Sequence, residues 1–333
     1  MRLILCLALL LHTALYCDSR YCVCIDGGGS KTLLQVIDNQ GKVISLNWDG
    51  GTTDKIEVTG SNINDIGNDG VRNTFSMLFD NVQVGSQNLR TFLPECKVIA
   101  CFAGIGAPQS RAIVASLLEE NGIKKDNLTL LTDAEAALQL ISDNGVILIS
   151  GTGSICMGKK DQKVCRVGGL GKMMGDEGSG YRIGLQAIKA GIEEEYGWGK
   201  PTHLSAALKE LYGVPDLISL IRPINLGEMT SAKIAIAAPI VFEKAFDKND
   251  AVAMSIINTA ATDLNTLLTK MITMTNLSQC EVHLWGSVFK NKHSQAFIQK
   301  MTADLVKERG IKIVNQAHHN VSLLLAKRSL MQS

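Results

Sequence analysis

The sequence predicts an α/β protein made of two similar lobes. Short apolar strand patterns alternate with helical patterns along the chain, and each half opens with three strands around a glycine-rich turn. The length of 333 residues suits two domains of roughly 100–200 residues each. With 46% hydrophobic and 20% charged residues, the chain can fill a sizeable core. A duplicated arrangement of this kind is expected to bind a ligand between its lobes.

The first half reads as three strands, a helix, a strand, a helix and a strand. Strand patterns are short apolar or alternating runs, and helical patterns repeat apolar residues every three or four positions. The predicted strands are Tyr21–Ile25, Thr32–Ile37, Lys42–Trp48, Lys97–Phe102 and Leu128–Leu131. The predicted helices are Ser61–Val82 and Pro108–Glu120.

The second half repeats the opening of three strands. Its predicted strands are Asn144–Ile149, Gly153–Met157, Lys163–Val167, Glu281–Leu284 and Ile311–Val314. Helices are predicted from Asp176 onward and at His203–Tyr212, Ser231–Phe246 and Ala251–Thr275, with one more before and one after the last strand. We therefore place the first lobe at residues 20–132 and the second at 133–316, with 317–333 as a candidate completion of the first lobe.

Composition narrows the class of function. The 33 basic residues nearly balance the 32 acidic ones, so a basic nucleic-acid-binding arm is not expected. Aromatic residues make up only 5%, which is unlike proteins that stack bases. The nine cysteines are scattered, and the spacing of Cys22 and Cys24 is that of one strand face. They are expected to be buried thiols rather than metal ligands.

Residues 1–19 form a hydrophobic leader. Arg2 precedes an apolar run from Leu3 to Leu11, and small residues near Cys17 resemble a signal-peptidase site. The run is too short to span a bilayer. A cleaved signal peptide and an uncleaved extension both fit this pattern.

The first candidate site is the turn Asp26–Thr32. Gly27, Gly28 and Gly29 permit close backbone approach, so that successive N–H groups could hold an anion. Ser30 and Thr32 add hydroxyl groups, Lys31 adds a positive charge, and Asp26 could hold a metal-bound water. A tight hairpin that merely needs glycine fits equally well.

A second loop of the same type, Gly151–Ser154, follows the apolar strand of the second half. Two such loops, one opening each half, suit the two ends of one polyphosphate. The stretch Gly153–Lys160 is not a P-loop, because Lys160 stands where Ser or Thr should bind magnesium. The stretch Gly169–Gly175 has one residue too many for a dinucleotide fingerprint.

Carboxylates supply the remaining chemistry. Asp133 follows an apolar strand and begins a helix, where it could accept a proton from a substrate hydroxyl or simply cap the helix. Asp176 and Glu177 lie between glycines at a predicted helix start. They could accept hydrogen bonds from sugar hydroxyls or complement the helix dipole.

Together these motifs resemble the N-acetylglucosamine kinase and BadF/BadG ATPase families of the actin-like superfamily, in register from residue 21 to 290. The string Gly169-Leu170-Gly171, followed by Met-Met-Gly-Asp-Glu-Gly-Ser, carries most of the resemblance. It implies a two-lobed actin-like (ribonuclease H-like) α/β fold and an ATP-dependent sugar kinase that uses Mg²⁺. The most fitting acceptor is N-acetyl-D-glucosamine, phosphorylated at its 6-position.

The resemblance also assigns roles to residues of this chain. It implies that Asp133 is the catalytic base, and Asp26, by its place at the strand end, is the candidate to hold Mg²⁺ through water. The implied nucleotide-binding residues are Gly28, Gly29, Ser30, Lys31, Thr32, Gly151, Thr152, Gly153, Gly286 and Ser287. The implied sugar-binding residues are Asn62, Ile63, Asp133, Gly169, Leu170, Gly171 and Asp176.

Several alternatives stay open at this stage. The acceptor could be glucosamine or N-acetylmuramic acid, or the chain could be a BadF-type ATPase that drives a partner dehydratase. The family often forms homodimers, and no membrane span is predicted. An ATP-dependent kinase is expected to be cytoplasmic, which conflicts with the leader. The segment 317–326 also departs from the Gly-Ala-rich helix that usually ends the family.

Overall fold

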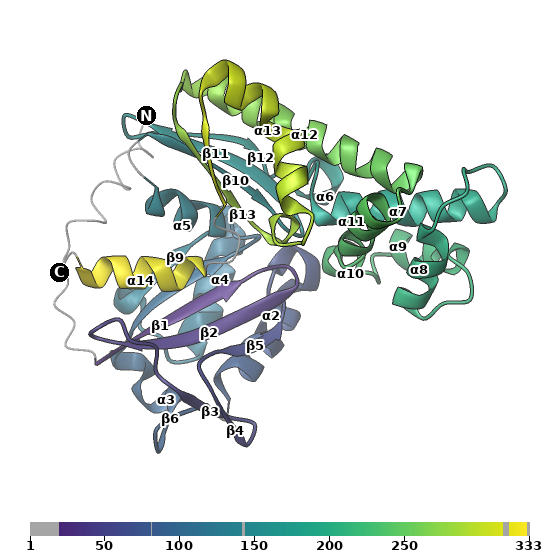
Figure 1. Cartoon of the computed structure of the whole chain (residues 1–333). Helices are drawn as coiled ribbons and strands as arrows, with labels where there is room; N and C mark the ends of the chain where they lie inside the picture. The colour runs from purple at the N-terminus through teal and green to yellow at the C-terminus, as the bar shows by residue number, and fades with distance from the viewer. Residues whose placement is uncertain (1–19, 81, 142–143, 316–319, 332–333) are drawn as a thin grey trace.

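Two five-stranded sheets of identical topology form the centres of the two lobes (Figure 1). The computed structural model describes residues 20–80, 82–141, 144–315 and 320–331, so the predicted leader lies outside the described residues. The first sheet has the order β5-β2-β1-β8-β9, and the second has the order β12-β11-β10-β13-β14. In the first sheet β2 is antiparallel to β1, whereas β8 is parallel to β1 and β9 is parallel to β8. In the second sheet β11 is antiparallel to β10, whereas β13 is parallel to β10 and β14 is parallel to β13. The predicted duplicated α/β architecture is confirmed.

With the exception of β5, the strands of these sheets lie close to the predicted ranges. The first sheet contains β1 (Tyr21–Gly27), β2 (Lys31–Asp38), β5 (Ile56–Thr59), β8 (Lys97–Phe102) and β9 (Leu128–Leu131). The second contains β10 (Gly145–Ser150), β11 (Ser154–Lys160), β12 (Lys163–Gly168), β13 (Glu281–Trp285) and β14 (Lys312–Asn315).

The prediction of Lys42–Trp48 as the third strand of the first sheet is wrong. Only Val43 forms a bridge there, to Ile37, and the third strand of the sheet is β5, which pairs with β2. The alternating burial of Ile56 and Val58 is the signal for β5. A separate small sheet contains β3 (Leu46–Trp48), β4 (Gly51–Thr53), β6 (Gln83–Val84) and β7 (Gln87–Asn88).

Helices cover both faces of the first sheet. The α2 helix (Ile63–Phe79) and the α4 helix (Pro108–Glu120) pack with Val23 and Ile25 on one face. On the other face, Cys22 and Cys24 pack with α5 (Asp133–Leu140) and α14 (Val321–Met331). This division follows the period of two along β1. The core that contains Cys22 and Cys24 also includes Ile147 and Met157 of the second sheet. The α5 and α14 helices therefore lie where the two lobes meet.

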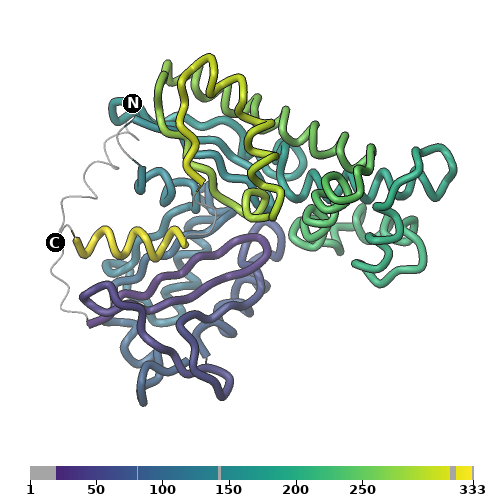
Figure 2. The backbone as a smooth tube through the Cα atoms, in the orientation of Figure 1, coloured from purple at the N-terminus to yellow at the C-terminus, as the bar shows by residue number. Residues whose placement is uncertain are grey.

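The C-terminal helix returns to the beginning of the chain. In Figure 2 the yellow C-terminal segment lies beside the purple strands of the first lobe. The α14 helix contacts β1, β8 and α5. Its first backbone N–H, at Val321, donates a hydrogen bond of 3.1 Å to the Asp26 carboxylate.

The second lobe carries a large helical layer. Its core joins Val146 and Leu148 of the sheet to the long helix α12 (Ala251–Thr275). The other helices of this lobe are α6 (Gly171–Met174), α7 (Gly180–Glu195), α8 (Leu204–Tyr212), α9 (Ile221–Asn225), α10 (Ser231–Ala235), α11 (Ala238–Asp247) and α13 (Ser294–Arg309). This lobe also contains the short elements η3 (Ile218–Leu220) and η4 (Ser287–Phe289), and the first lobe contains α3 (Leu89–Phe92), η1 (Leu93–Glu95) and η2 (Lys125–Asn127).

Three helix predictions need correction. The helix predicted at Ser61–Val82 spans Ile63–Phe79 and is interrupted at Gly67, whose φ is 66°. The helix predicted at Ser231–Phe246 is two helices, because Pro239 lies at the start of α11 and cannot continue α10. The helix predicted from Asp176 begins at Gly180.

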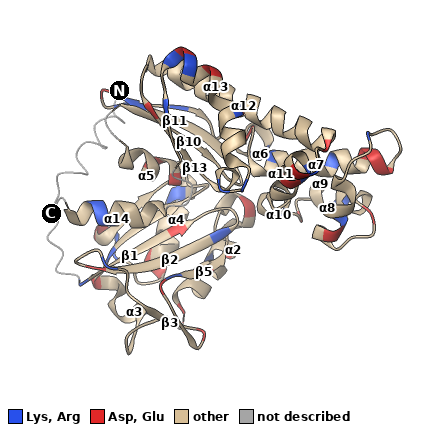
Figure 3. Cartoon of the chain, in the orientation of Figure 1, with Lys and Arg blue, Asp and Glu red and all other residues tan. Residues whose placement is uncertain are grey.

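The charged residues and the cysteines are distributed as expected for a folded α/β protein. Basic and acidic residues are interspersed along both lobes (Figure 3). The cysteines in the described ranges are free thiols, and all but the half-buried Cys165 are buried. Among the described helices, none combines the length and apolar character that crossing a membrane requires.

Candidate active site

The two glycine-rich loops meet between the lobes. Ser30 lies in the β1–β2 turn and Thr152 in the β10–β11 turn, 122 residues apart in the sequence, yet their hydroxyl oxygens are 3.1 Å apart. A Cβ atom on Gly29 would lie 3.0 Å from the Thr152 hydroxyl oxygen, so this approach depends on glycine. The duplicated sheets therefore bring both candidate phosphate loops to one place.

Hydrogen bonds hold the first loop in shape. The Gly28 N–H donates to the Lys31 carbonyl at 2.9 Å, and the Ser61 N–H donates to the Gly28 carbonyl at 3.0 Å. Thr32 is fully buried and donates its hydroxyl to the Ser61 oxygen at 2.8 Å. Its side chain thus supports the turn from inside the first lobe. The Lys31 ammonium forms an exposed ion pair with Glu57 at 3.0 Å.

The second loop is tied to the start of α7. The N–H groups of Gly180 and Tyr181 donate to the carbonyls of Gly151 and Thr152, at 2.8 and 3.2 Å. The Asp176 carboxylate accepts the Ser154 N–H at 3.1 Å. Asp176, predicted on the sugar side, therefore contacts the second phosphate loop.

Asp176 is held in a strained turn rather than in a helix. Its φ of 62° is unusual for a residue other than glycine. Burial raises the pKa of Asp176, and the charges of Glu177 and Asp65 add to this, whereas the Ser154 N–H and the Arg182 cation lower it. Because Ser179 caps α7, the helix does not begin at the acidic pair and the helix-dipole interpretation is not supported.

A cavity of about 210 Å³ opens beside both loops. Ser30 and Thr152 line one end, and Ser287, from the turn after β13, lines another part. Gly286 brings that turn close: its φ is 105°, and a Cβ there would lie 2.2 Å from the Ser150 carbonyl oxygen. The remaining lining residues are Gly180, Ala235, Ile236, Ala238, Pro239, Phe242, Val288 and Asn291.

The sequence pattern does not predict the lining residues from α10 and α11. It predicts one continuous helix there, whereas the chain breaks between the two helices and both Ala235 and Pro239 line the cavity. Pro239 was the available signal, since proline inside a helical pattern indicates a helix end.

Asp133 begins α5 but does not cap it. Thr132 is the N-cap: its side chain accepts the Glu135 N–H at 3.0 Å, and the Glu135 carboxylate accepts the Thr132 N–H at 2.8 Å. The Asp133 carboxylate accepts the N–H of the next residue, Ala134, at 2.9 Å, and its own backbone N–H is a second donor. The helix-cap interpretation of Asp133 is therefore wrong, because Thr132 holds the cap position.

The environments of Asp133 and Asp26 are electrostatically linked. Burial raises the pKa of Asp133, and Glu135 adds to the shift, whereas the Ala134 N–H and Arg166 oppose it. Burial and then the charge of Asp133 raise the pKa of Asp26 to about 6, although the N–H group of Val321 opposes the shift. The repulsion between the two carboxylates would be relieved by a nearby cation. Among the described residues, however, no group of three or more His, Cys, Asp or Glu side chains gathers to hold a metal ion.

The sugar-side residues of the first lobe lie at the start of α2. Asn62 caps this helix, and its Oδ1 accepts the Asn64 N–H at 3.1 Å. Gly104 lies against it, since a Cβ on Gly104 would be 2.1 Å from the Asn62 Oδ1. Ile63 is buried, so its side chain belongs to the core of the first lobe.

The segment Gly169–Gly171 connects β12 to α6. Gly169 and Gly171 have positive φ angles of 68° and 78°, and Leu170 between them is 57% exposed. The Arg166 guanidinium donates hydrogen bonds to the carbonyls of Gly168, at 3.1 Å, and of Gly169. Arg166 therefore holds this segment while its charge acts on Asp133, a double role that the sequence did not reveal.

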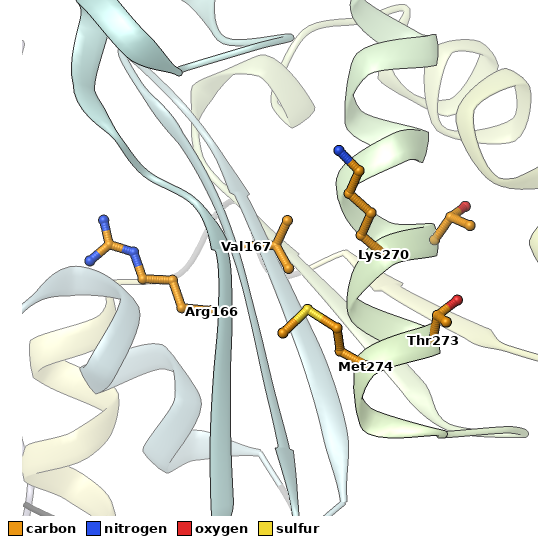
Figure 4. A pocket seen from close by; sticks show the side chains of 6 residues that line it. Arg166, Val167, Lys270, Thr273 and Met274 are labelled. Atoms are coloured by element: carbon orange, nitrogen blue, oxygen red, sulfur yellow. The ribbon is translucent and has the colours of Figure 1, made fainter.

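A second hollow, of about 420 Å³, lies between β12 and α12. The residues that line it are Arg166 and Val167 of β12 and Thr269, Lys270, Thr273 and Met274 of α12 (Figure 4). The Arg166 side chain points the other way, as expected for neighbouring residues of one strand. None of the predicted site residues lines this hollow.

Comparison with known proteins places this geometry in a family. The sequence matches the BadF/BadG/BcrA/BcrD ATPase family over residues 23–323, and the chain belongs to that family. An N-acetylmuramic acid/N-acetylglucosamine kinase of Clostridium acetobutylicum is 32% identical over 74% of this chain and 77% of its own length. An N-acetyl-D-glucosamine kinase of Dictyostelium discoideum is 26% identical over 77% of this chain and 81% of its own length.

Solved structures confirm the actin-like ATPase fold. A candidate N-acetylglucosamine kinase from Chromobacterium violaceum superposes with a TM-score of 0.67, covering 93% of this chain and 99% of its own at 20% identity. A ROK family glucokinase from Streptomyces griseus, solved with glucose and AMPPNP, gives a TM-score of 0.52 at 14% identity and covers 94% of this chain and 100% of its own.

Proposed function

We propose that this protein is an ATP-dependent amino-sugar kinase, with N-acetyl-D-glucosamine as acceptor and its 6-phosphate as product. The observation that carries the proposal is the meeting of Ser30 and Thr152 at 3.1 Å beside the 210 Å³ cavity. Two phosphate loops at the mouth of one cavity suit a nucleoside triphosphate whose base and ribose occupy the cavity. The names of the two curated relatives support the choice of an amino sugar.

Phosphoryl transfer depends mainly on positioning and on charge stabilisation. Backbone N–H groups of the loops around Gly29 and Gly153 would hold the terminal phosphates. Asp133, with one carboxylate oxygen bound to the Ala134 N–H, would accept the proton of the sugar hydroxyl with its other oxygen. Closure of the lobes would exclude water, which competes with the hydroxyl as acceptor.

Asp26 is the residue that would hold Mg²⁺, through water, as a carboxylate at the end of β1 beside the phosphate turn. When bound, the ion supplies neutralisation of phosphate charge. The N–H groups of Val321, at 3.1 Å, and of Ser322 donate to the Asp26 carboxylate and fix its orientation.

The proposal is tested by measuring ATP consumption by the full-length protein with N-acetylglucosamine, glucosamine and N-acetylmuramic acid offered separately. Turnover that requires one sugar is the expected result, and it identifies the acceptor. Phosphorus NMR of the product then locates the phosphorylated hydroxyl. ATP hydrolysis that is indifferent to every sugar would contradict the proposal and favour an ATPase that acts on a partner protein.

The pH dependence of this reaction follows from the environment of Asp133. A general base must be ionised, and burial raises the pKa of Asp133. As the pH is lowered, activity should therefore begin to fall at a pH above the usual titration range of an aspartate. Arg166→Met removes a cation that lowers this pKa. The acid limb of kcat/KM is therefore expected to move to higher pH, and Arg166→Lys should restore it. Lys270→Met, which removes a charge from α12 on the other side of β12, is the control and should leave the acid limb of kcat/KM in place. Coincident pH profiles for Arg166→Met and wild type would refute the effect of Arg166 on Asp133.

The cavity makes a separate prediction about ATP. Ala235→Phe would place a ring in the cavity beside Ser287 and Phe242. We expect the KM for ATP to rise about tenfold, equivalent to ~1.4 kcal/mol, because the ring competes with the nucleoside for space. Steady-state kinetics at saturating sugar measure it. Ala232→Phe, on the same helix but outside the cavity lining, is the control; equal effects of the two variants would mean that the cavity does not receive the nucleotide.

The lobe boundaries and the assembly also remain proposals. The packing of α14 on β1 and β8 supports assigning residues 317–333 to the first lobe, next to residues 20–132, with 133–316 as the second. We further propose a homodimer in an ATP-containing compartment such as the cytoplasm. Sedimentation of the purified protein tests the first, and localisation of the tagged chain tests the second.

A further inference from the structure

One carboxylate joins the lobes on the sugar side of the cleft. Asp65 lies in the first turn of α2, and its side chain is only 6% exposed. Its Oδ1 accepts a hydrogen bond from the hydroxyl of Ser231 at 2.9 Å. Ser231 begins α10 of the second lobe, 166 residues later in the chain. Side-chain hydrogen bonds of this kind between lobes constrain how the lobes are placed relative to each other.

Lys172 approaches the same carboxylate from the sugar-side segment. Its ammonium nitrogen is 3.8 Å from the Asp65 Oδ1, an ion-pair distance that is too long for a hydrogen bond. The segment that carries Lys172 follows Gly169–Gly171, which has left-handed backbone at both glycines. Asp65 therefore faces the segment that the family resemblance assigns to sugar binding.

The second oxygen of Asp65 lacks a donor among the described residues. Its Oδ2 is buried and accepts no hydrogen bond from them. A buried carboxylate oxygen without a donor has lost its hydration and gained no hydrogen bond in return. The arrangement is thus incomplete, and a modest movement of the Lys172 ammonium would complete it.

The turn that carries Asp65 is separated from the rest of α2. Gly67 interrupts the helix with φ 66° and ψ −177°, so residues 63–66 form a short unit of their own. The Asp65 N–H donates to the Asn62 carbonyl at 2.9 Å. A force on Asp65 therefore acts on the turn that orients Asn62, the predicted sugar-binding residue.

We propose that Asp65 is a positioning residue that joins the two lobes over the bound sugar, through Ser231 in the resting state and through Lys172 as well when the Gly169–Asp176 segment closes. This proposal rests on the proposed function for its kinetic consequence. It also predicts a contact between lobes that is measurable without any substrate.

The substrate-free test is a double-mutant cycle between lobes. Asp65→Ala, Ser231→Ala and the double variant are unfolded in urea, with Asp65→Asn as a milder fourth variant if Asp65→Ala does not fold. We expect the double variant to be no less stable than the less stable single variant, because one hydrogen bond is lost in each. Additive shifts of the urea midpoint would overturn the contact, whatever the substrate of the protein.

The kinetic test separates positioning from simple support of the fold. Asp65→Asn and Lys172→Met are each expected to raise the KM for the sugar about tenfold, with kcat and the KM for ATP changed much less. ATP hydrolysed per sugar phosphorylated should also rise, because a weakly closed cleft admits water. Asp69→Asn, the same change at an exposed position further along α2, is the control.

The outcomes distinguish the two proposals. Absence of sugar phosphorylation in the wild type overturns the proposed function, while the urea cycle still tests the contact. Coupled urea midpoints with an unchanged KM for the sugar in both Asp65→Asn and Lys172→Met overturn the positioning role. Coupled midpoints together with a raised sugar KM support it.

Discussion

Asp133→Asn is expected to lower kcat by roughly 10²–10⁴, the usual contribution of general-base catalysis, and to leave sugar binding nearly intact. The Asn side chain has the same shape and keeps an oxygen for the Ala134 N–H, but it cannot take a proton at neutral pH. The helix itself should be unaffected, because the capping box of Thr132 and Glu135 holds its first turn. Single-turnover kinetics at saturating sugar and ATP measure the chemical step directly.

Two controls make this result specific. Asp126→Asn is the same chemical change at an exposed position in η2, shortly before β9, and should leave kcat unchanged. Thr132→Ala removes the cap and should cost about 1 kcal/mol of folding free energy. Turnover of Asp133→Asn within a few-fold of wild type would show that Asp133 is not the base.

Most of the fold could be predicted because local periodicity and tertiary structure agree. The ranges Lys97–Phe102, Pro108–Glu120 and Ala251–Thr275 match the observed elements. Each has an apolar pattern that only one burial arrangement satisfies: a central strand buried on both faces, or a helix with one buried face. The repeated opening of three strands predicted the duplicated sheets for the same reason.

The wrong predictions occur where strand pairing or backbone geometry overrides the local hydrophobic pattern. Lys42–Trp48 contains apolar residues typical of a strand, but the segment that pairs with β2 is Ile56–Thr59, which is shorter and lies further along the chain. Which segment becomes the edge strand depends on long-range pairing, which a single sequence does not record. The division of Ser231–Phe246, by contrast, was readable from Pro239.

In the candidate site, too, some features could be predicted from the sequence and others could not. The glycine-rich turns were recognisable because few residues other than glycine permit the Gly29–Thr152 approach or the φ of Gly286. What the sequence could not show is which way each side chain points. Thr32 turns inward to Ser61, and Asp176 turns to the second loop, since both positions depend on partners that are distant in the sequence.

Gly153→Val is expected to abolish ATP binding, with an affinity loss of at least about 100-fold, or ~2.7 kcal/mol. A Cβ atom on Gly153 would lie 2.8 Å from the Asp176 Oδ1, closer than real Cβ atoms come to such an oxygen. Valine would therefore push the Asp176 carboxylate away and break its hydrogen bond with the Ser154 N–H. The Gly151–Ser154 loop would lose the hydrogen bond that holds its shape, and the valine methyl groups would occupy space beside the loop.

Isothermal titration with a non-hydrolysable ATP analogue measures this loss without any assumption about the acceptor. Gly51→Val is the matched control, because it is the same substitution in the exposed strand β4, where a Cβ meets nothing closer than the Trp48 carbonyl at 3.8 Å. The circular dichroism spectrum should confirm that both variants are folded. Because the Asp176 carboxylate accepts the Ser154 N–H of this loop, Asp176→Asn should weaken ATP binding in the same direction but less. Unchanged ATP affinity in folded Gly153→Val protein would remove the Gly151–Ser154 loop from the nucleotide site, and with it the pairing of two loops on which the kinase proposal rests.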